Sequence, residues 1–147
     1  MKKNKYRIQI AVLLLLLTVA AFIRKQTEPW RPDQLKEPKD LAAIINDSTV
    51  AKPLIISVGP AGLIKGAINI GPTQEKENLN KLNELLSKEK KDREIMIYCG
   101  CCPFKNCPNI RPAFSLLNSM KFTNHKLLNL SNNLKADWIN YDYPMND

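Results

Sequence analysis

All four cysteines of this chain, Cys99, Cys101, Cys102 and Cys107, lie within nine residues, and the rest of the sequence has none. A disulfide framework spreads its half-cystines along the chain so that they close long loops. A local cluster therefore indicates a chemical site, although a loop stapled by local disulfides is an alternative. Cysteine thiolates act as nucleophiles and bind soft metal ions. We expect one of these chemistries at residues 99–107.

The cysteine cluster follows a predicted strand and precedes a predicted helix. Residues 95–98, Ile-Met-Ile-Tyr, are the short apolar run of a strand buried on both faces. Beyond the cluster, Asn109 is a competent N-cap, so Arg111 falls in the first turn of the helix. A strand–loop–helix bend directs backbone N–H groups and the helix dipole at an anion, which lowers a cysteine pKa. We therefore expect a reactive Cys99 thiolate with Arg111 nearby.

The remaining elements alternate between helix and strand. We expect, in chain order, a helix over 38–46, strands over 54–58 and 67–70, a helix around 79–86, the strand over 95–98, a helix over 113–120, a strand over 126–130 and a short helix capped by Ser131 that carries Trp138. This alternation predicts a three-layer α/β/α fold with a mostly parallel sheet. Ligands of such sheets bind beyond the carboxyl ends of the strands, where residues 99–107 belong.

The amino terminus has the pattern of an export signal. Four of its first seven residues are basic, and a nearly unbroken apolar run follows over residues 10–23. This predicts a signal peptide or an uncleaved signal anchor helix over 1–25, a linker over 26–34 and a folded domain over 35–147. Trp30, in the linker, is expected to pack onto the domain edge. The domain would be periplasmic, or membrane-anchored and outside the cytoplasm.

The net charge of +8 does not indicate a nucleic-acid partner. Six basic residues precede the first acidic residue, Glu28, and from there on 16 Lys and Arg face 14 Asp and Glu, which leaves +2. Most of the basic charge therefore belongs to the amino terminus, and we expect no nucleic-acid binding. The single histidine, His125, is expected in a surface turn.

Ile97-Tyr98-Cys99, a loop, Arg111 and a helix follow one another along the chain. This succession looks like the active-site segment of the rhodanese-like domain family. Residues 62–70, Gly-Leu-Ile-Lys-Gly-Ala-Ile-Asn-Ile, are similar to its Gly-His-Ile-x-Gly-Ala-x-Asn-Ile segment, and residues 127–130 followed by Trp138 and Tyr143-Pro144 resemble its closing segment. The resemblance extends over residues 35–145.

This resemblance implies a sulfurtransferase or a persulfide carrier without a cofactor. Cys99 matches the nucleophile and Arg111 the arginine that closes the loop, and eleven residues separate the two, a longer loop than the family has. The substrate-binding loop would comprise Gly100, Cys101, Cys102, Lys105 and Cys107. Its partners would be a small sulfur-donor anion and a thiol acceptor.

Other interpretations of the same residues stay open. One is thiol-redox chemistry, or a copper or zinc site, whose ligands would be Cys99, Cys101, Cys102 and Cys107. Another is a phosphatase-like or arsenate-reducing loop, but Cys99 is followed six positions later by Lys105, and lysine lacks the bidentate fork of arginine. A non-catalytic binding module is the last.

Overall fold

A computed structural model describes residues 28–146, so the expected signal or anchor over residues 1–25 lies outside the described part. The described chain forms one five-stranded sheet in the order β1-β5-β4-β2-β3, and every strand pair is parallel. The strands are β1 (Leu35–Lys36), β2 (Leu54–Ser57), β3 (Ile68–Asn69), β4 (Ile95–Tyr98) and β5 (His125–Leu128). Within residues 28–146, no helix is both long and apolar enough to span a membrane.

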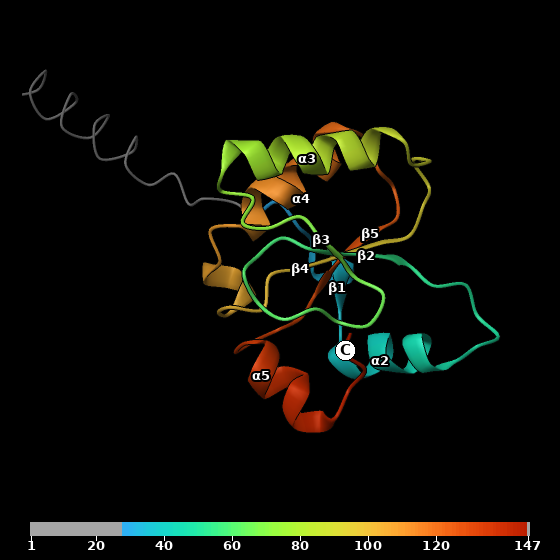
Figure 1. The fold of residues 1–147 in the computed structure, drawn as a ribbon. Helices are drawn as coiled ribbons and strands as arrows, with labels where there is room; N and C mark the ends of the chain where they lie inside the picture. Colours follow the sequence, from blue (N-terminus) through green and yellow to red (C-terminus); the bar gives the residue numbers. More distant parts are fainter. Residues whose placement is uncertain (1–27, 147) are drawn as a thin grey trace, which may run out of the picture.

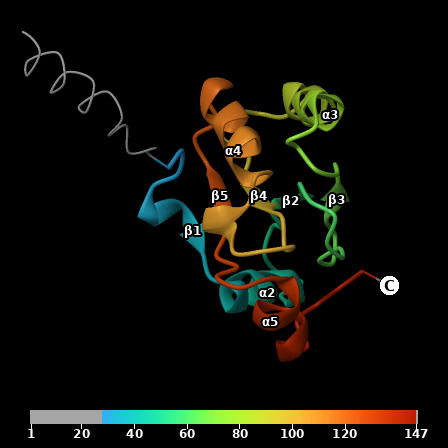
Figure 2. The same cartoon turned by 90° about the vertical axis from the view of Figure 1, so that its left-hand side faces the viewer.

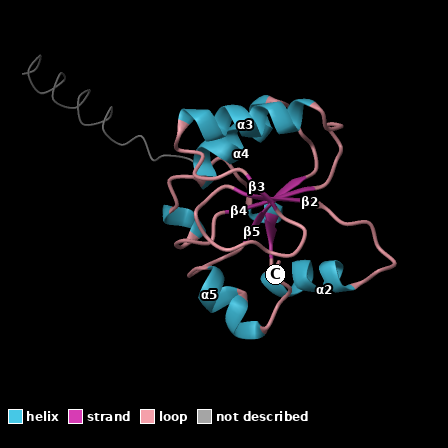
Figure 3. Cartoon of the chain, viewed as in Figure 1, coloured by secondary structure: helices cyan, strands magenta, loops and turns pink. Residues whose placement is uncertain are grey.

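Helices cover both faces of the sheet (Figures 1 and 3). The helices α3 (Lys76–Ser87) and α4 (Ile110–Ser119) lie on one face, and α2 (Pro38–Asn46) and α5 (Leu134–Asp137) lie on the other (Figure 2). Short 3-10 turns are η1 (Pro32–Gln34), η2 (Phe104–Asn106) and η3 (Ile139–Tyr141). The predicted α/β class with a parallel sheet is confirmed, and the arrangement is compatible with three α/β/α layers.

The central strand β4 explains how the sequence produces two cores. Ile95 and Ile97 pack in the core beneath α3 and α4, whereas Met96 and Tyr98 pack in the core beneath α2 and α5. All four side chains are fully buried, which is why the strand is a continuous apolar run in the sequence. By the same alternation, Cys99 belongs to the α3 and α4 side.

The first and last residues of two elements are predicted correctly from the sequence. The helix α2 and the strand β4 begin and end at the predicted residues. The last helix differs, because its N-cap is Asn133, whose side chain accepts a hydrogen bond from Ala136 N at 2.9 Å, and not Ser131. Trp138 directly follows this helix, is fully buried, and donates from Nε1 to the Pro144 carbonyl oxygen at 3.1 Å.

The segment before β1 is part of the packed domain. Trp30 is only 8% exposed, and its ring makes edge contacts with Phe104 and Phe114 at centroid distances of 5.8 and 5.9 Å. The expectation that Trp30 packs onto the domain is confirmed, but the ring belongs to the buried core between the cysteine loop and α4 rather than to the domain edge. Ordered packing therefore begins before residue 35.

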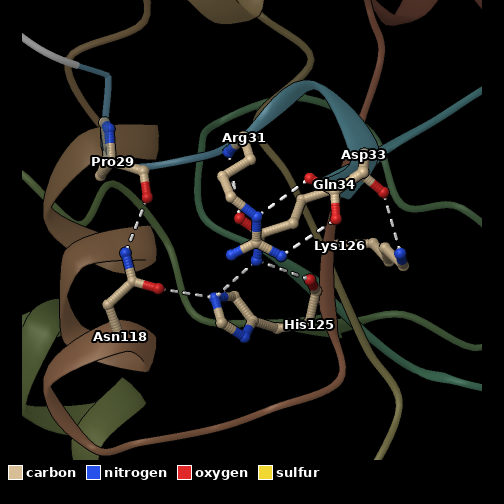
Figure 4. A network of polar contacts seen from close by, with 7 residues as sticks. All are labelled: Pro29, Arg31, Asp33, Gln34, Asn118, His125 and Lys126. Carbon is tan, nitrogen blue, oxygen red and sulfur yellow. Dashed lines mark hydrogen bonds and ion pairs between the residues drawn. The ribbon is translucent and has the colours of Figure 1, made fainter.

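A network of hydrogen bonds around His125 connects the segment before β1 to α4 and to strand β5 (Figure 4). Asn118 donates from Nδ2 to the Pro29 carbonyl oxygen at 2.7 Å, so its Oδ1 accepts from His125 Nε2 at 2.9 Å. Gln34 donates to the His125 carbonyl oxygen at 3.3 Å. His125 is 4% exposed at the start of β5, so the expected surface turn is wrong. Its burial lowers the pKa of His125, and the ring is neutral at pH 7.

Candidate functional site

Cys99 is the first residue after β4, at the carboxyl edge of the sheet. The neighbouring strand β2 reaches this edge too, where Val58 N donates to the Tyr98 carbonyl oxygen at 2.9 Å. Gly59 then passes so close that a Cβ there would lie 2.2 Å from Cys99 Sγ. Cys99 is only 2% exposed. The expected position beyond a central strand is therefore confirmed, but its sulfur is covered rather than open to solvent.

The loop after Cys99 is anchored at both ends and in its middle. Gly100 has a φ of +81°, and its carbonyl oxygen accepts from Leu134 N at 2.8 Å. Phe104 N donates to the Leu130 carbonyl oxygen at 3.1 Å, and the Phe104 side chain is buried at the start of η2. Cys107, at the end of this turn, is fully buried. The long loop is therefore packed against the domain, in spite of its length.

Three of the four cysteine sulfurs come together. The Sγ atoms of Cys99, Cys101 and Cys107 all lie within 4.8 Å of one another, and Cys99 Sγ is 3.3 Å from Cys101 Sγ. Cys102 stands outside this trio, with its Sγ 3.4 Å from Cys101 Sγ. All four are free thiols, and Cys101 is the exposed one. The sequence places all four cysteines in one loop, but in the folded loop only Cys99, Cys101 and Cys107 bring their sulfurs together, and among these sulfurs that of Cys102 contacts Cys101 alone.

The neighbours of Cys99 stabilise its thiolate. Its pKa is lowered to about 5, chiefly by the neighbouring Cys107 thiol and further by the Asn109 side chain and by the backbone N–H and thiol of Cys101, against the opposing effect of burial. The proximity of Cys99 raises the pKa of Cys107, and burial together with the Cys99 contact raises that of Cys101 to about 12. The direction of this pKa shift favours the Cys99 thiolate, and both side-chain donors and the Cys101 backbone N–H contribute to it.

Asn109 has a role that sequence reasoning missed. Its side chain makes no capping hydrogen bond within α4. Instead its Oδ1 accepts from Gln74 N at 3.2 Å, which turns Nδ2 toward Cys99 Sγ at 3.5 Å. Thr73 adds a hydrogen bond from its hydroxyl to the Asn109 carbonyl oxygen at 2.5 Å. The segment between β3 and α3 therefore orients a donor for the thiolate, and no local pattern indicates this long-range contact.

Exchanging Asn109 for aspartate tests this arrangement. Asn109→Asp replaces the amide donor by a carboxylate of nearly the same shape, so we expect the pKa of Cys99 to rise by at least about 1. The pH dependence of alkylation, with Cys99 identified by peptide mass, measures it. Asn106→Asp adds the same charge at an exposed position of the loop and is the matched control. An unchanged Cys99 profile in Asn109→Asp would contradict the assigned role.

Arg111 does not lie where the sequence predicted. Its Nη2 donates to both carboxylate oxygens of Glu28, at 2.8 and 2.9 Å, and to the Lys105 carbonyl oxygen at 2.8 Å. Its guanidinium carbon lies 5.5 Å from the centre of the Trp30 ring. The expectation that Arg111 holds an anion or the thiolate is therefore wrong, because its charge is paired with Glu28. Its guanidinium instead binds the cysteine loop through the Lys105 carbonyl oxygen. Lys105 is an exposed residue of η2, within the cysteine loop as the sequence predicted.

Two surface cavities lie away from the cysteines. One, of about 370 Å³, is on the α2 and α5 side and includes Glu37, Asp137 and Tyr141; the other, of about 190 Å³, includes Lys52 and Lys65. Neither of these two cavities is lined by a cysteine.

Fold and site together define a parallel α/β domain with the buried sulfur of Cys99 and two neighbouring thiols at the carboxyl edge of its sheet. No protein-family model matches the chain, and no curated protein sequence matches it. The similarity to rhodanese-like domains therefore stays a prediction from the sequence.

Proposed function

We propose that this protein is a rhodanese-like sulfurtransferase or persulfide carrier in which Cys99 accepts the sulfur. The observation that carries the proposal is the set of hydrogen-bond donors around one sulfur, with the Asn109 amide at 3.5 Å and the Cys101 thiol at 3.3 Å from Cys99 Sγ. Such donors stabilise the thiolate, which is the nucleophilic form of cysteine. The parallel α/β fold, with the loop after its central strand, is compatible with that family.

The transfer takes two balanced displacement steps. The Cys99 thiolate attacks the outer sulfur of thiosulfate or of a persulfide, a new S–S bond forms, and sulfite or the donor thiolate leaves with the electron pair of the broken bond. An acceptor thiolate then attacks the outer sulfur of the Cys99 persulfide, and the Cys99 thiolate leaves. The same hydrogen bonds favour this departure, because a thiol of low pKa is the better leaving group.

Cys101 limits how long the persulfide survives. If its thiolate attacked the inner sulfur on Cys99, a Cys99–Cys101 disulfide would form and hydrosulfide would leave. The raised pKa of Cys101, about 12, keeps it protonated at neutral pH and slows this reaction. A persulfide on Cys99 is therefore lost to Cys101 more slowly than it would be to a thiol of ordinary pKa. The exposed Lys105 is positioned to attract an anionic sulfur donor.

The proposed location is outside the cytoplasm, anchored in the membrane if the apolar segment is not cleaved. It rests on the charged and apolar pattern of residues 1–25.

Sulfane loading of the full chain tests the function. After incubation with thiosulfate or polysulfide, we expect wild type and Cys102→Ser to carry one additional sulfur atom by intact mass and to release thiocyanate with cyanide. Cys99→Ser should do neither. Cys102→Ser is the matched control, because it removes a thiol from the same loop outside the trio. Full loading of Cys99→Ser, with loss in Cys101→Ser or Cys107→Ser, would show that Cys99 is not the nucleophile.

A further inference from the structure

The three clustered sulfurs have the spacing of ligands to one metal ion. Sulfurs bound at ~2.3 Å from a common ion lie roughly 3.8–4.0 Å apart in trigonal or tetrahedral geometry. The Sγ atoms of Cys99, Cys101 and Cys107 lie within 4.8 Å of one another, and Cys99 Sγ and Cys101 Sγ are 3.3 Å apart. Small side-chain rotations therefore bring all three to bonding distance from one point between them.

The backbone holds these ligands in place before any ion arrives. Gly100, with its φ of +81°, turns the chain so that Cys99 and Cys101 present their sulfurs to the same side. A Cβ at Gly100 would lie 2.9 Å from Leu134 Cβ, so the turn is closely packed. Cys107 is fixed from the other direction by the buried turn that begins at Phe104. A preorganised site of this kind binds an ion without ordering a flexible loop.

The chemistry of the ligands selects a soft ion. Among residues 28–146, no histidine or carboxylate joins the three cysteines. His125, the single histidine, is engaged with Asn118 of α4 instead. Thiolates without nitrogen or oxygen ligands favour Cu⁺, whereas structural zinc sites take four ligands. Cys102, beside Cys101 but outside the trio, supplies no fourth.

We propose that Cys99, Cys101 and Cys107 form a three-coordinate site for Cu⁺. Binding is not a redox step: Cys99 binds as the thiolate, Cys101 and Cys107 each release one proton, and the ion keeps its charge. Two ligands are buried and Cys101 is exposed, so Cys101 is the ligand at which copper passes to and from another thiol. The proposal goes beyond sulfur transfer, and the two are mutually exclusive in time, because both occupy the Cys99 sulfur.

The test is a Cu⁺ titration of the reduced full chain without oxygen, in competition with a chromophoric Cu⁺ chelator. We expect one copper per chain, three sulfur neighbours by X-ray absorption, and an affinity that falls more than about tenfold in Cys101→Ser and in Cys107→Ser. Cys102→Ser, the matched control, should keep the affinity of wild type. Cys101 is exposed, so its variant remains informative if Cys107→Ser fails to fold.

Some outcomes would overturn the copper site. These are no copper retained against the chelator, a sulfur count of two or four, or an equal loss in Cys102→Ser. The sulfur-transfer proposal is tested separately, by sulfane loading of the copper-free wild type. If the wild type binds copper but does not load sulfane sulfur, the sulfur-transfer proposal is wrong and the copper-site proposal stands.

Discussion

Replacing Gly59 by alanine is expected to reduce sulfane loading of Cys99 by roughly 100-fold, because it displaces the reacting sulfur. The new Cβ would lie 2.2 Å from Cys99 Sγ, 2.9 Å from its carbonyl oxygen and 3.2 Å from its Cα. Rotation of the Cys99 side chain relieves only the first of these contacts. The strands β2 and β4 must also separate at their carboxyl ends, and overpacking of this kind costs about 1–3 kcal/mol.

The rate of sulfane loading and the urea midpoint together measure this effect. Gly66→Ala is the matched control: Gly66 has a φ of +79°, and a Cβ added there would meet no atom within 4 Å, so alanine strains the backbone without touching the site. It should lose about 1–2 kcal/mol of stability and load sulfur normally. Normal loading by Gly59→Ala would show that the sulfur reacts from a position other than the one beside Gly59.

Replacing Trp30 by alanine is expected to lower the free energy of unfolding by about 3–5 kcal/mol, the range for a large buried aromatic side chain. Small domains have only about 5–15 kcal/mol in total. The change removes the ring that contacts Phe104 in the cysteine loop and Phe114 in α4, and it also takes away the surface beneath Arg111. The loop should therefore open more often, and Cys107 should be alkylated faster.

Denaturant unfolding and the alkylation rate of Cys107 measure these two consequences. Tyr141→Ala is the comparison, since Tyr141 is 64% exposed and its loss should cost less than about 1 kcal/mol. If Trp30→Ala is as stable as Tyr141→Ala and protects Cys107 equally, residues 28–34 do not belong to the core. They would then be the plain linker that their composition predicts.

Helix and strand positions followed from local patterns. The apolar run at Ile95–Tyr98 predicted β4 because a strand covered on both faces buries every side chain, and Pro38 marked the start of α2 because proline fits the first helical turn. The N-cap of α5 is Asn133 and not Ser131, because both residue types cap helices well and the sequence does not distinguish between them. His125 was misplaced and the burial of Trp30 was underestimated, because both depend on contacts far along the chain.

The sequence alone determined that the cysteines stand together and that Cys99 directly follows a buried strand, because both depend on neighbours along the chain. Only the tertiary structure decided which sulfurs converge, since the fold of the loop leaves Cys102 outside. It also decided that Arg111 pairs with Glu28, 83 positions away, and leaves Asn109 beside the thiolate. A side chain's residue type limits the bonds it can make, but packing between distant segments selects the partner.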